Sequence, residues 1–455
     1  MKLDLENATR EELIQLNLQL IARLQTLEEQ VKQLKAELDS LRGGGSQSNP
    51  SSFVKANRPA RSKKKKRKKR AHGFSRKLDK PTARVEHSLE QCPDCKLDLI
   101  GRRVVKSRQV IELPPVQVQV VEHLLVERSC PNCRKRWTPG LDLSSLVVGK
   151  QRFGISVQAE VALLREACRL PFRVIQDYLL HRFALRVSVG QLVALVEGVA
   201  RAGKAVVEGF KHDIRGSPVV NGDETSWRED GQNGYVWSFS TDKVRYFLYR
   251  KSRSASVVKE ILGDDFEGIV VSDFYGGYNA HLGLHQRCWV HLLRDIHELK
   301  EKHAKDKGLK KWAKAVKAIY ERAKAYKRPN AGLAPVEQQQ QRAKRQREFE
   351  QELMKVCRPH IKKKKVYSKL CERIERFLPE LFVFVADARV PSDNNAAERS
   401  VRQLVVSRKI SGGTRSARGS ETKSILASLF GTWRLQRLDL YQRCWNLLTA
   451  KNPTL

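Results

Sequence analysis

The sequence predicts a multidomain α+β protein in which a coiled coil, a small metal-binding module and a helical domain precede a core of strands and helices. Three observations carry this prediction: leucines at heptad spacing near the start, two Cys-Pro-x-Cys pairs, and a later change from helical to strand patterns. With 455 residues, the chain is long enough for about two to four domains of roughly 150 residues each.

The chain is strongly basic, with 87 Lys and Arg against 50 Asp and Glu and a formal net charge of +37. A positive field of this size attracts polyanions, so nucleic acid is the leading partner. No apolar run reaches the length of about 18 residues that a membrane helix needs, and the first residues lack a signal-peptide pattern. We therefore expect a cytoplasmic protein that does not span a membrane.

Residues 1–42 are predicted to form a parallel coiled-coil helix, because apolar residues recur there in alternating steps of four and three. Leucine occupies the d positions, at Leu13, Leu20, Leu27, Leu34 and Leu41. Asn17, at an a position, is the kind of polar residue that fixes register in a two-stranded coil. We expect a homodimer or a higher oligomer; an amphipathic helix packed on its own domain is the alternative.

Residues 43–85 are predicted to be a flexible basic linker. Gly, Ser, Asn and Pro dominate residues 43–59, and the run KKKKRKKR follows at 63–70. Adjacent cations repel one another and stay solvated. The run is therefore a polyanion-binding arm, a solubilising segment or, in a nucleus, an import signal.

Residues 86–150 are predicted to bind zinc. CPDC supplies Cys92 and Cys95, and CPNC supplies Cys130 and Cys133. Four thiolates complete a tetrahedral site for one Zn²⁺ and leave no open coordination position, which indicates a structural ion. Alternating segments such as VQVQVVEHLLVE between the pairs favour a zinc-ribbon-like module that joins two hairpins. Four reduced core thiols are the alternative.

Residues 151–215 predict a helical domain that is a candidate DNA-binding domain. The pattern over residues 171–200 indicates a helix, a short turn and a second helix, which Ser188 is placed to cap. It fits a helix-turn-helix that docks on DNA, and it fits equally well two helices that simply pack together.

Residues 216–299 predict the first part of a catalytic core. A short strand runs into Asp223, two more strands meet at residues 241–243, a helix follows at 254–262, and a buried strand ends in Asp273. The order strand, strand, strand, helix, strand is that of an RNase H-like α/β core. In such a core neighbouring parallel strands place the two carboxylates side by side.

Residues 386–455 predict the second part of the core, and Glu398 lies there on a helix that Ser392 or Asp393 opens. Helical spacing turns Glu398 away from the apolar face of this helix, so that it can face the two aspartates. Asp393 caps the helix and points elsewhere, because five residues rotate a helix by about 140° net.

Three carboxylates of this kind suit two Mg²⁺ ions, which clamp the attacking and leaving oxygens of an in-line phosphoryl transfer. Each acid also has a structural interpretation: Asp223 and Asp273 could cap turns, and Glu398 could pair with Arg402. Their joint occurrence in a basic, zinc-binding chain favours catalysis.

Residues 300–385 are basic and helical, which predicts an α-helical insertion between the two parts of the core that lies along DNA. Just before it, Cys288 and His291 form a C-x-x-H pair. No second half of a zinc site lies nearby in sequence, so we expect a structural role for this pair near the active site.

Four segments resemble DDE transposases of the bacterial insertion-sequence family IS66: GDET, SDFYGGYNAH, CWVHLLRDIHEL and DNNAAERSVR. With the N-terminal features, the resemblance covers nearly the whole chain, and it implies that Asp223, Asp273 and Glu398 bind the catalytic metals. The chain departs from the family's common pattern at Gly222, where Ala is frequent, and at Phe274, where Gly is frequent.

The resemblance implies a Mg²⁺-dependent DNA transposase of the bacterial nucleoid. Water would hydrolyse a phosphodiester at each element end, and the freed 3′-OH would then attack target DNA. Double-stranded DNA of the element ends and of the target is the expected partner, and accessory proteins of the same element are further candidates. The alternatives are an RNase H-like nuclease without strand transfer and a zinc-containing DNA-binding regulator.

Overall fold

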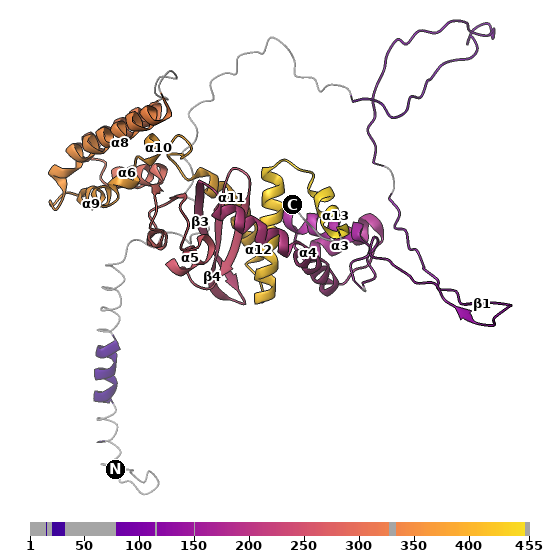
Figure 1. The fold of residues 1–455 in the computed structure, drawn as a ribbon, viewed down its shortest axis with the longest axis horizontal. Helices are drawn as coiled ribbons and strands as arrows, with labels where there is room; N and C mark the ends of the chain where they lie inside the picture. Colours follow the sequence, from indigo (N-terminus) through magenta and orange to yellow (C-terminus); the bar gives the residue numbers. More distant parts are fainter. Residues whose placement is uncertain are drawn as a thin grey trace. The chain divides into compact units, whose positions relative to one another are not determined.

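The computed structural model describes residue 15 and residues 21–31, 79–113, 116–149, 151–326 and 334–450 (Figure 1). The chain divides into two units, Met1–Glu112 and Leu113–Leu455. In the first unit, residues 21–31 are helical and their apolar side chains, such as Leu24 and Leu27, are exposed. The remainder of the predicted coiled coil, and the basic linker up to residue 78, fall outside the described residues.

Both Cys-Pro-x-Cys segments form the same tight turn. The N–H of the first cysteine donates to the carbonyl five residues later, at 2.8 Å for Cys92 and for Cys130. The residue after the second cysteine has a positive φ in each turn, 61° at Lys96 and 56° at Arg134. Strands β1 (Arg128–Ser129) and β2 (Arg136–Trp137) flank the second turn as a short hairpin.

The alternating segment at residues 116–127, between the cysteine pairs, is not a strand in the described chain. Its side chains are exposed. Alternation alone does not make a strand, because the backbone N–H and C=O groups also need a partner strand.

After the hairpin of β1 and β2 the second unit continues with helices, and here the predicted helix pair is confirmed. Helix α2 (Ile155–Ala162) continues into a π-helical turn, η1 (Leu163–Ala167), and helices α3 (Phe172–Phe183) and α4 (Val189–Arg215) follow. The hydroxyl of Ser188 accepts from the N–H of Gln191 at 3.2 Å and caps α4. Helix α4 buries an apolar face from Leu192 to Ile214 in the main core.

Five strands form one mixed sheet in the order β5-β4-β3-β6-β7. The long strands β3 (Val219–Glu229), β4 (Gln232–Ser240) and β5 (Arg245–Arg250) are antiparallel neighbours. Strands β6 (Ile269–Ser272) and β7 (His285–Arg287) add to the other side in parallel, after helix α5 (Ala255–Leu262) crosses over. This mixed sheet is compatible with the catalytic core of a DDE enzyme.

Helices from the end of the chain complete the core. Helix α11 (Asn395–Ser411) lies against β3 and β4, and α12 (Ala417–Leu435) lies along β5 (Figure 1). Three hydroxyls of α12, on Ser424, Ser428 and Thr432, accept the outward N–H groups of β5 at 2.9 to 3.0 Å. The edge strand is thereby paired with side chains, which blocks its addition to another sheet. Helix α13 (Leu440–Thr449) ends the described chain.

A second group of helices stands between β7 and α11 and has its own apolar core. It comprises α6 (Trp289–Lys302), α7 (Lys307–Ala325), α8 (Pro335–Cys357), α9 (Ser368–Arg376) and the short α10 (Val383–Ala386). The insertion is helical as the sequence predicts, and its first helix begins directly after β7. Across the described residues, no helix combines the length and the apolar character needed to cross a membrane.

Candidate active site

Asp223 and Asp273 lie at the same level of two neighbouring parallel strands. The pairing of β3 with β6 joins residues 50 positions apart, from Val219 with Ile269 to Asn221 with Val271. Side chains of a strand point to the same face every two residues. Extending the register by two residues brings Asp223 opposite Asp273, which directly follows β6. The expected side-by-side placement of the two aspartates follows from this register.

Backbone contacts orient both aspartates. Asp223 Oδ1 accepts from the N–H of Glu224 at 2.9 Å, and Asp273 Oδ1 accepts from the N–H of Tyr275 at 2.9 Å. The carbonyl of Asp273 also accepts from Nη1 of Arg287 at 2.9 Å. Arg287 is buried, and its Nε donates to Glu380 of the insertion at 2.6 Å. The loop that carries Asp273 is thus tied to the insertion.

Glu398 lies in the first turn of α11, where the predicted helix places it. Its Oε1 is 3.7 Å from Nε2 of His291 and 3.9 Å from Nη2 of Arg294, both on α6. The apolar face of α11 is buried at Ala397, Val401 and Leu404, as expected.

Asn394 fixes where α11 begins, and the sequence analysis did not single it out. Its side-chain amide donates to the carbonyl of Gly222 at 2.7 Å, and its Oδ1 accepts from Asn221 at 3.0 Å. The helix therefore begins one residue later than the capping signals suggest, because contacts with β3 determine its start. Asp393 lies just before it, and its Oδ1 accepts from the N–H of Asn395 at 3.1 Å.

The electrostatics of Asp223 show that the acids act on one another. The pKa of Asp223 is raised to about 7, chiefly by burial; the negative charges of Glu224, Asp273 and Glu398 contribute to this shift, and the N–H of Glu224 opposes it. Buried carboxylates that repel one another suit a divalent cation, whose charge would offset the repulsion, although the ligand oxygens of Asp223, Asp273 and Glu398 do not all lie within 4.8 Å of one another.

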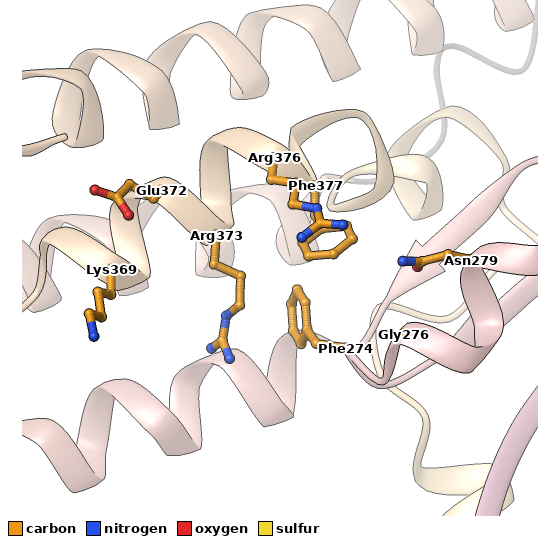
Figure 2. Close-up of a pocket in the computed structure, with 8 residues that line it drawn as sticks. All are labelled: Phe274, Gly276, Asn279, Lys369, Glu372, Arg373, Arg376 and Phe377. Atoms are coloured by element: carbon orange, nitrogen blue, oxygen red, sulfur yellow. The ribbon is translucent and has the colours of Figure 1, made fainter. Parts of the chain in front are cut away.

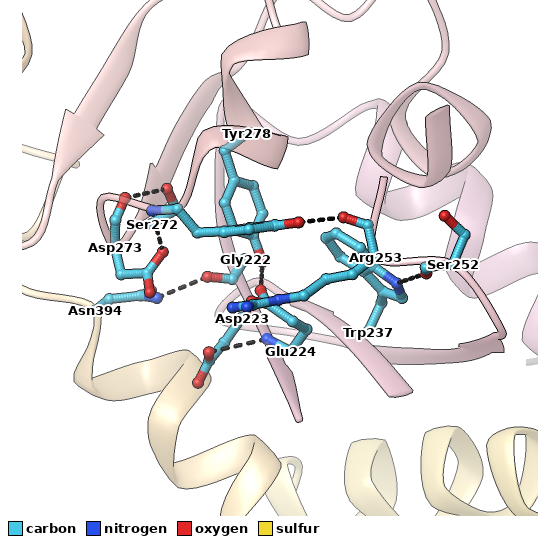
Figure 3. A network of polar contacts seen from close by, with 11 residues as sticks. Gly222, Asp223, Glu224, Trp237, Ser252, Arg253, Ser272, Asp273, Tyr278 and Asn394 are labelled. Atoms are coloured by element: carbon cyan, nitrogen blue, oxygen red, sulfur yellow. Dashed lines mark hydrogen bonds and ion pairs between the residues drawn. The ribbon is translucent and has the colours of Figure 1, made fainter. Parts of the chain in front are cut away.

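Gly222 allows an aromatic ring to approach the site. A Cβ at this position would lie 2.7 Å from Cε1 of Tyr278, so Ala would clash with the ring. The Tyr278 hydroxyl donates to Glu224 Oε2 at 2.7 Å (Figure 3). The departure from the common Ala at this position therefore accompanies a close contact between Tyr278 and β3.

Glu224 is a fourth carboxylate, and it is already neutralised. Its side chain is 3% exposed, and its Oε1 accepts from Nε of Arg253 at 2.9 Å. The Arg253 guanidinium stacks 3.8 Å from the ring centroid of Tyr275. Burial raises the pKa of Glu224, and the hydrogen bonds from Arg253 and Tyr278 oppose that shift. This paired carboxylate is less suited to metal binding than Asp223.

A basic, aromatic pocket of about 680 Å³ lies beside Asp273, between the core and helix α9 (Figure 2). The rings of Phe274 and Phe377 meet edge to face, and the guanidinium of Arg373 lies 4.6 Å from the Phe274 centroid. The lining residues are Phe274, Gly276, Asn279, Lys369, Glu372, Arg373, Arg376 and Phe377. Three cations against one acid make this pocket attractive to an anion.

The two cysteine turns share one electrostatic feature. Backbone N–H groups of the turn lower the pKa of Cys92 and of Cys130, with the N–H of the second cysteine of each pair acting most strongly. The N–H of Cys133 lies 3.5 Å from the Cys130 sulfur. Turns that stabilise a thiolate in this way suit metal binding.

A family model described as Transposase IS66 family matches residues 150–422. The chain belongs to the IS66 transposase family. The matched region contains Asp223, Asp273 and Glu398 together with the whole insertion, so the resemblance drawn from the sequence is confirmed. No curated protein matches the chain.

Proposed function

We propose that this IS66 family transposase is a DDE enzyme with an RNase H-like core, and that Asp223, Asp273 and Glu398 hold two Mg²⁺ ions. The observation that carries the proposal is the parallel register of β3 and β6, which brings the two aspartates to equivalent positions; the contribution of the Glu398 charge to the raised pKa of Asp223 supports it. Carboxylate oxygens are the ligands that Mg²⁺ prefers.

When bound, the two ions would activate the attacking oxygen and stabilise the leaving oxygen of an in-line displacement at phosphorus. The chain's own contribution is positioning. Asn394 sets the start of α11, and thereby the place of Glu398, while Arg287 holds the loop of Asp273. The network of Glu224, Arg253 and Tyr278 holds the strand segment next to Asp223.

The proposed reaction has two steps on DNA. Water attacks the phosphodiester at the element end, the bond from phosphorus to the 3′ oxygen breaks, and this oxygen leaves as a 3′-OH. The freed 3′-OH then attacks a phosphodiester of target DNA, whose own bond from phosphorus to the 3′ oxygen breaks and releases a target 3′-OH. Lys369, Arg373 and Arg376 line the pocket beside Asp273, and they would contact phosphates close to the reacting one. The helical insertion and helices α3 and α4 are the proposed further DNA contacts.

We also propose one structural Zn²⁺ bound by Cys92, Cys95, Cys130 and Cys133. Two observations support it: the paired spacing in the sequence and the common geometry of both turns, each with N–H groups directed at a sulfur. Residues 1–42 are proposed to form the coiled coil that makes the protein a homodimer or a higher oligomer. An equal mass per particle with and without residues 1–45, measured by light scattering, would contradict this.

The proposed function is tested with the full chain and DNA duplexes that carry the inverted repeats flanking its gene. The proposal predicts Mg²⁺-dependent nicks that leave a 3′-OH, followed by joining of those ends to a target plasmid. Nicks without joining would identify a nuclease. A gel shift without any nick would identify a DNA-binding regulator. Either result would contradict the transposase chemistry.

A further inference from the structure

Cys288, His291 and Glu398 meet where the insertion leaves the core. Cys288 is the N-cap residue of α6, His291 follows one turn later, and Glu398 stands in the first turn of α11. One ligand atom from each residue lies within 4.8 Å of the other two, and within the described part of the chain no other three Cys, His, Asp or Glu side chains gather so closely.

Two atoms of this cluster are buried without a hydrogen-bond partner: Nδ1 of His291 and Oε1 of Glu398. The distance of 3.7 Å from Nε2 of His291 to Oε1 of Glu398 is too long for a hydrogen bond. Buried polar atoms in proteins are nearly always paired, and a bound ion is one established reason for an exception. Nη2 of Arg294, 3.9 Å from Oε1 of Glu398, is likewise too far away for a hydrogen bond, so the cluster keeps capacity to bind a ligand.

The spacing suits one small cation. A tetrahedral Zn²⁺ with bonds of about 2.1 Å to nitrogen and oxygen separates those two ligand atoms by roughly 3.4 Å. The observed 3.7 Å requires only a small adjustment. The sulfur of Cys288 accepts from the N–H of Asn394 at 3.2 Å and lies at the N-terminus of α6, contacts that favour the thiolate, whereas burial raises the pKa of the thiol.

We propose that Cys288, His291 and Glu398 form a three-ligand site for Zn²⁺, and that an ion bound there engages the Glu398 carboxylate needed by the Mg²⁺ site. Thiolate and imidazole select Zn²⁺ over Mg²⁺, which prefers oxygen ligands. Binding transfers the Cys288 thiol proton to water and forms a sulfur–zinc bond. Zn²⁺ therefore inhibits Mg²⁺-dependent cleavage by competing for one shared ligand.

Metal binding is measured first, without any DNA. The full chain is dialysed against Zn²⁺ and its metal content is determined, and the Cys288→Ser variant is expected to hold one zinc fewer per chain than the wild type. Cys444→Ser replaces another buried cysteine outside the cluster and is expected to match the wild type. Equal zinc content in the Cys288→Ser variant and the wild type would overturn the proposal.

A spectroscopic measurement reports on the individual ligands. Co²⁺ is added to full chains that carry Cys92→Ser and Cys130→Ser, which removes the signal of the proposed structural site. A near-ultraviolet band of thiolate-bound cobalt is expected, absent with Cys288→Ser and at least about tenfold weaker in affinity with His291→Gln. His297→Gln, on the same helix, is the matched control and should keep the wild-type affinity. An unchanged band with Cys288→Ser would exclude the site.

The competition of Zn²⁺ with the Mg²⁺ site for Glu398 rests on the proposed function, so it is tested separately from zinc binding. Zn²⁺ is titrated into the cleavage reaction at fixed Mg²⁺, and each protein is normalised to its own rate without zinc. The concentration for half-inhibition should rise at least about tenfold with Cys288→Ser. Equal inhibition of both proteins would overturn the competition. If no protein cleaves DNA, the proposed function fails, whereas the zinc content still decides the metal site.

Discussion

Asn394 is the residue whose replacement should most clearly link the fold to the site. It is 1% exposed and makes two hydrogen bonds to β3, at 2.7 Å to the Gly222 carbonyl and at 3.0 Å to the Asn221 amide. In the Asn394→Ala variant, the Gly222 carbonyl and the Asn221 side-chain amide each lose a hydrogen bond in a buried environment. Each unpaired buried group costs about 1 to 3 kcal/mol, so the free energy of unfolding should fall by about 2 to 6 kcal/mol.

The assay for Asn394→Ala is urea denaturation followed by tryptophan fluorescence, since Trp227 and Trp237 are buried in the sheet. Asn395→Ala, one residue further along, is the matched control, and we expect it to change the free energy by less than about 0.5 kcal/mol. The same pair of variants is assayed for cleavage, where Asn394→Ala should be much slower because Glu398 is displaced. Similar stability of the two variants would refute the role given to Asn394.

Three further predictions concern other parts of the chain. Lys423→Met should lower the free energy of unfolding by about 3 to 5 kcal/mol, because it leaves Glu166 buried without its ion-pair partner at 2.7 Å; urea denaturation checks this, and wild-type stability would contradict it. Burial holds the pKa of His285 well below its usual value, so the folded state binds fewer protons than the unfolded state. Stability measured against pH should therefore fall as pH drops below about 6.5, and less so in His285→Gln. Metal analysis of protein purified without added zinc should find one tightly held Zn²⁺ per chain, lost with Cys92→Ser and Cys130→Ser together; zinc retained in that variant would contradict the structural site.

The strand order and the helix pair were predictable because they depend on local patterns. Each strand shows its own apolar run, and Ser188 shows the capping position of α4 in the sequence. The alignment of Asp223 with Asp273 also followed, since parallel strands bring equivalent positions together. Helical periodicity placed Glu398 away from the apolar face of α11.

The supporting contacts were not predictable, because they join residues far apart in the chain. Asn394 and the Gly222 carbonyl are 172 positions apart, and nothing local marks them as partners. Cys288 and His291 have no further metal ligand near them in the sequence, because the third ligand candidate, Glu398, comes from α11, more than 100 residues later. Residues 116–127 show the converse case: their sequence alternates like that of a strand, but they have no partner strand in the described chain.

The central claim is that Asp223, Asp273 and Glu398 are the acids that support strand cleavage. It is tested most directly by assaying Glu398→Gln and Asp393→Asn for Mg²⁺-dependent nicking and for binding of the same element-end duplex at one stated salt concentration. We expect Glu398→Gln to bind DNA normally and to lose nicking, and Asp393→Asn to keep both activities because the Asn side-chain oxygen can still accept from the N–H of Asn395. Normal nicking by Glu398→Gln alongside inactive Asp393→Asn would contradict the choice of the third acid.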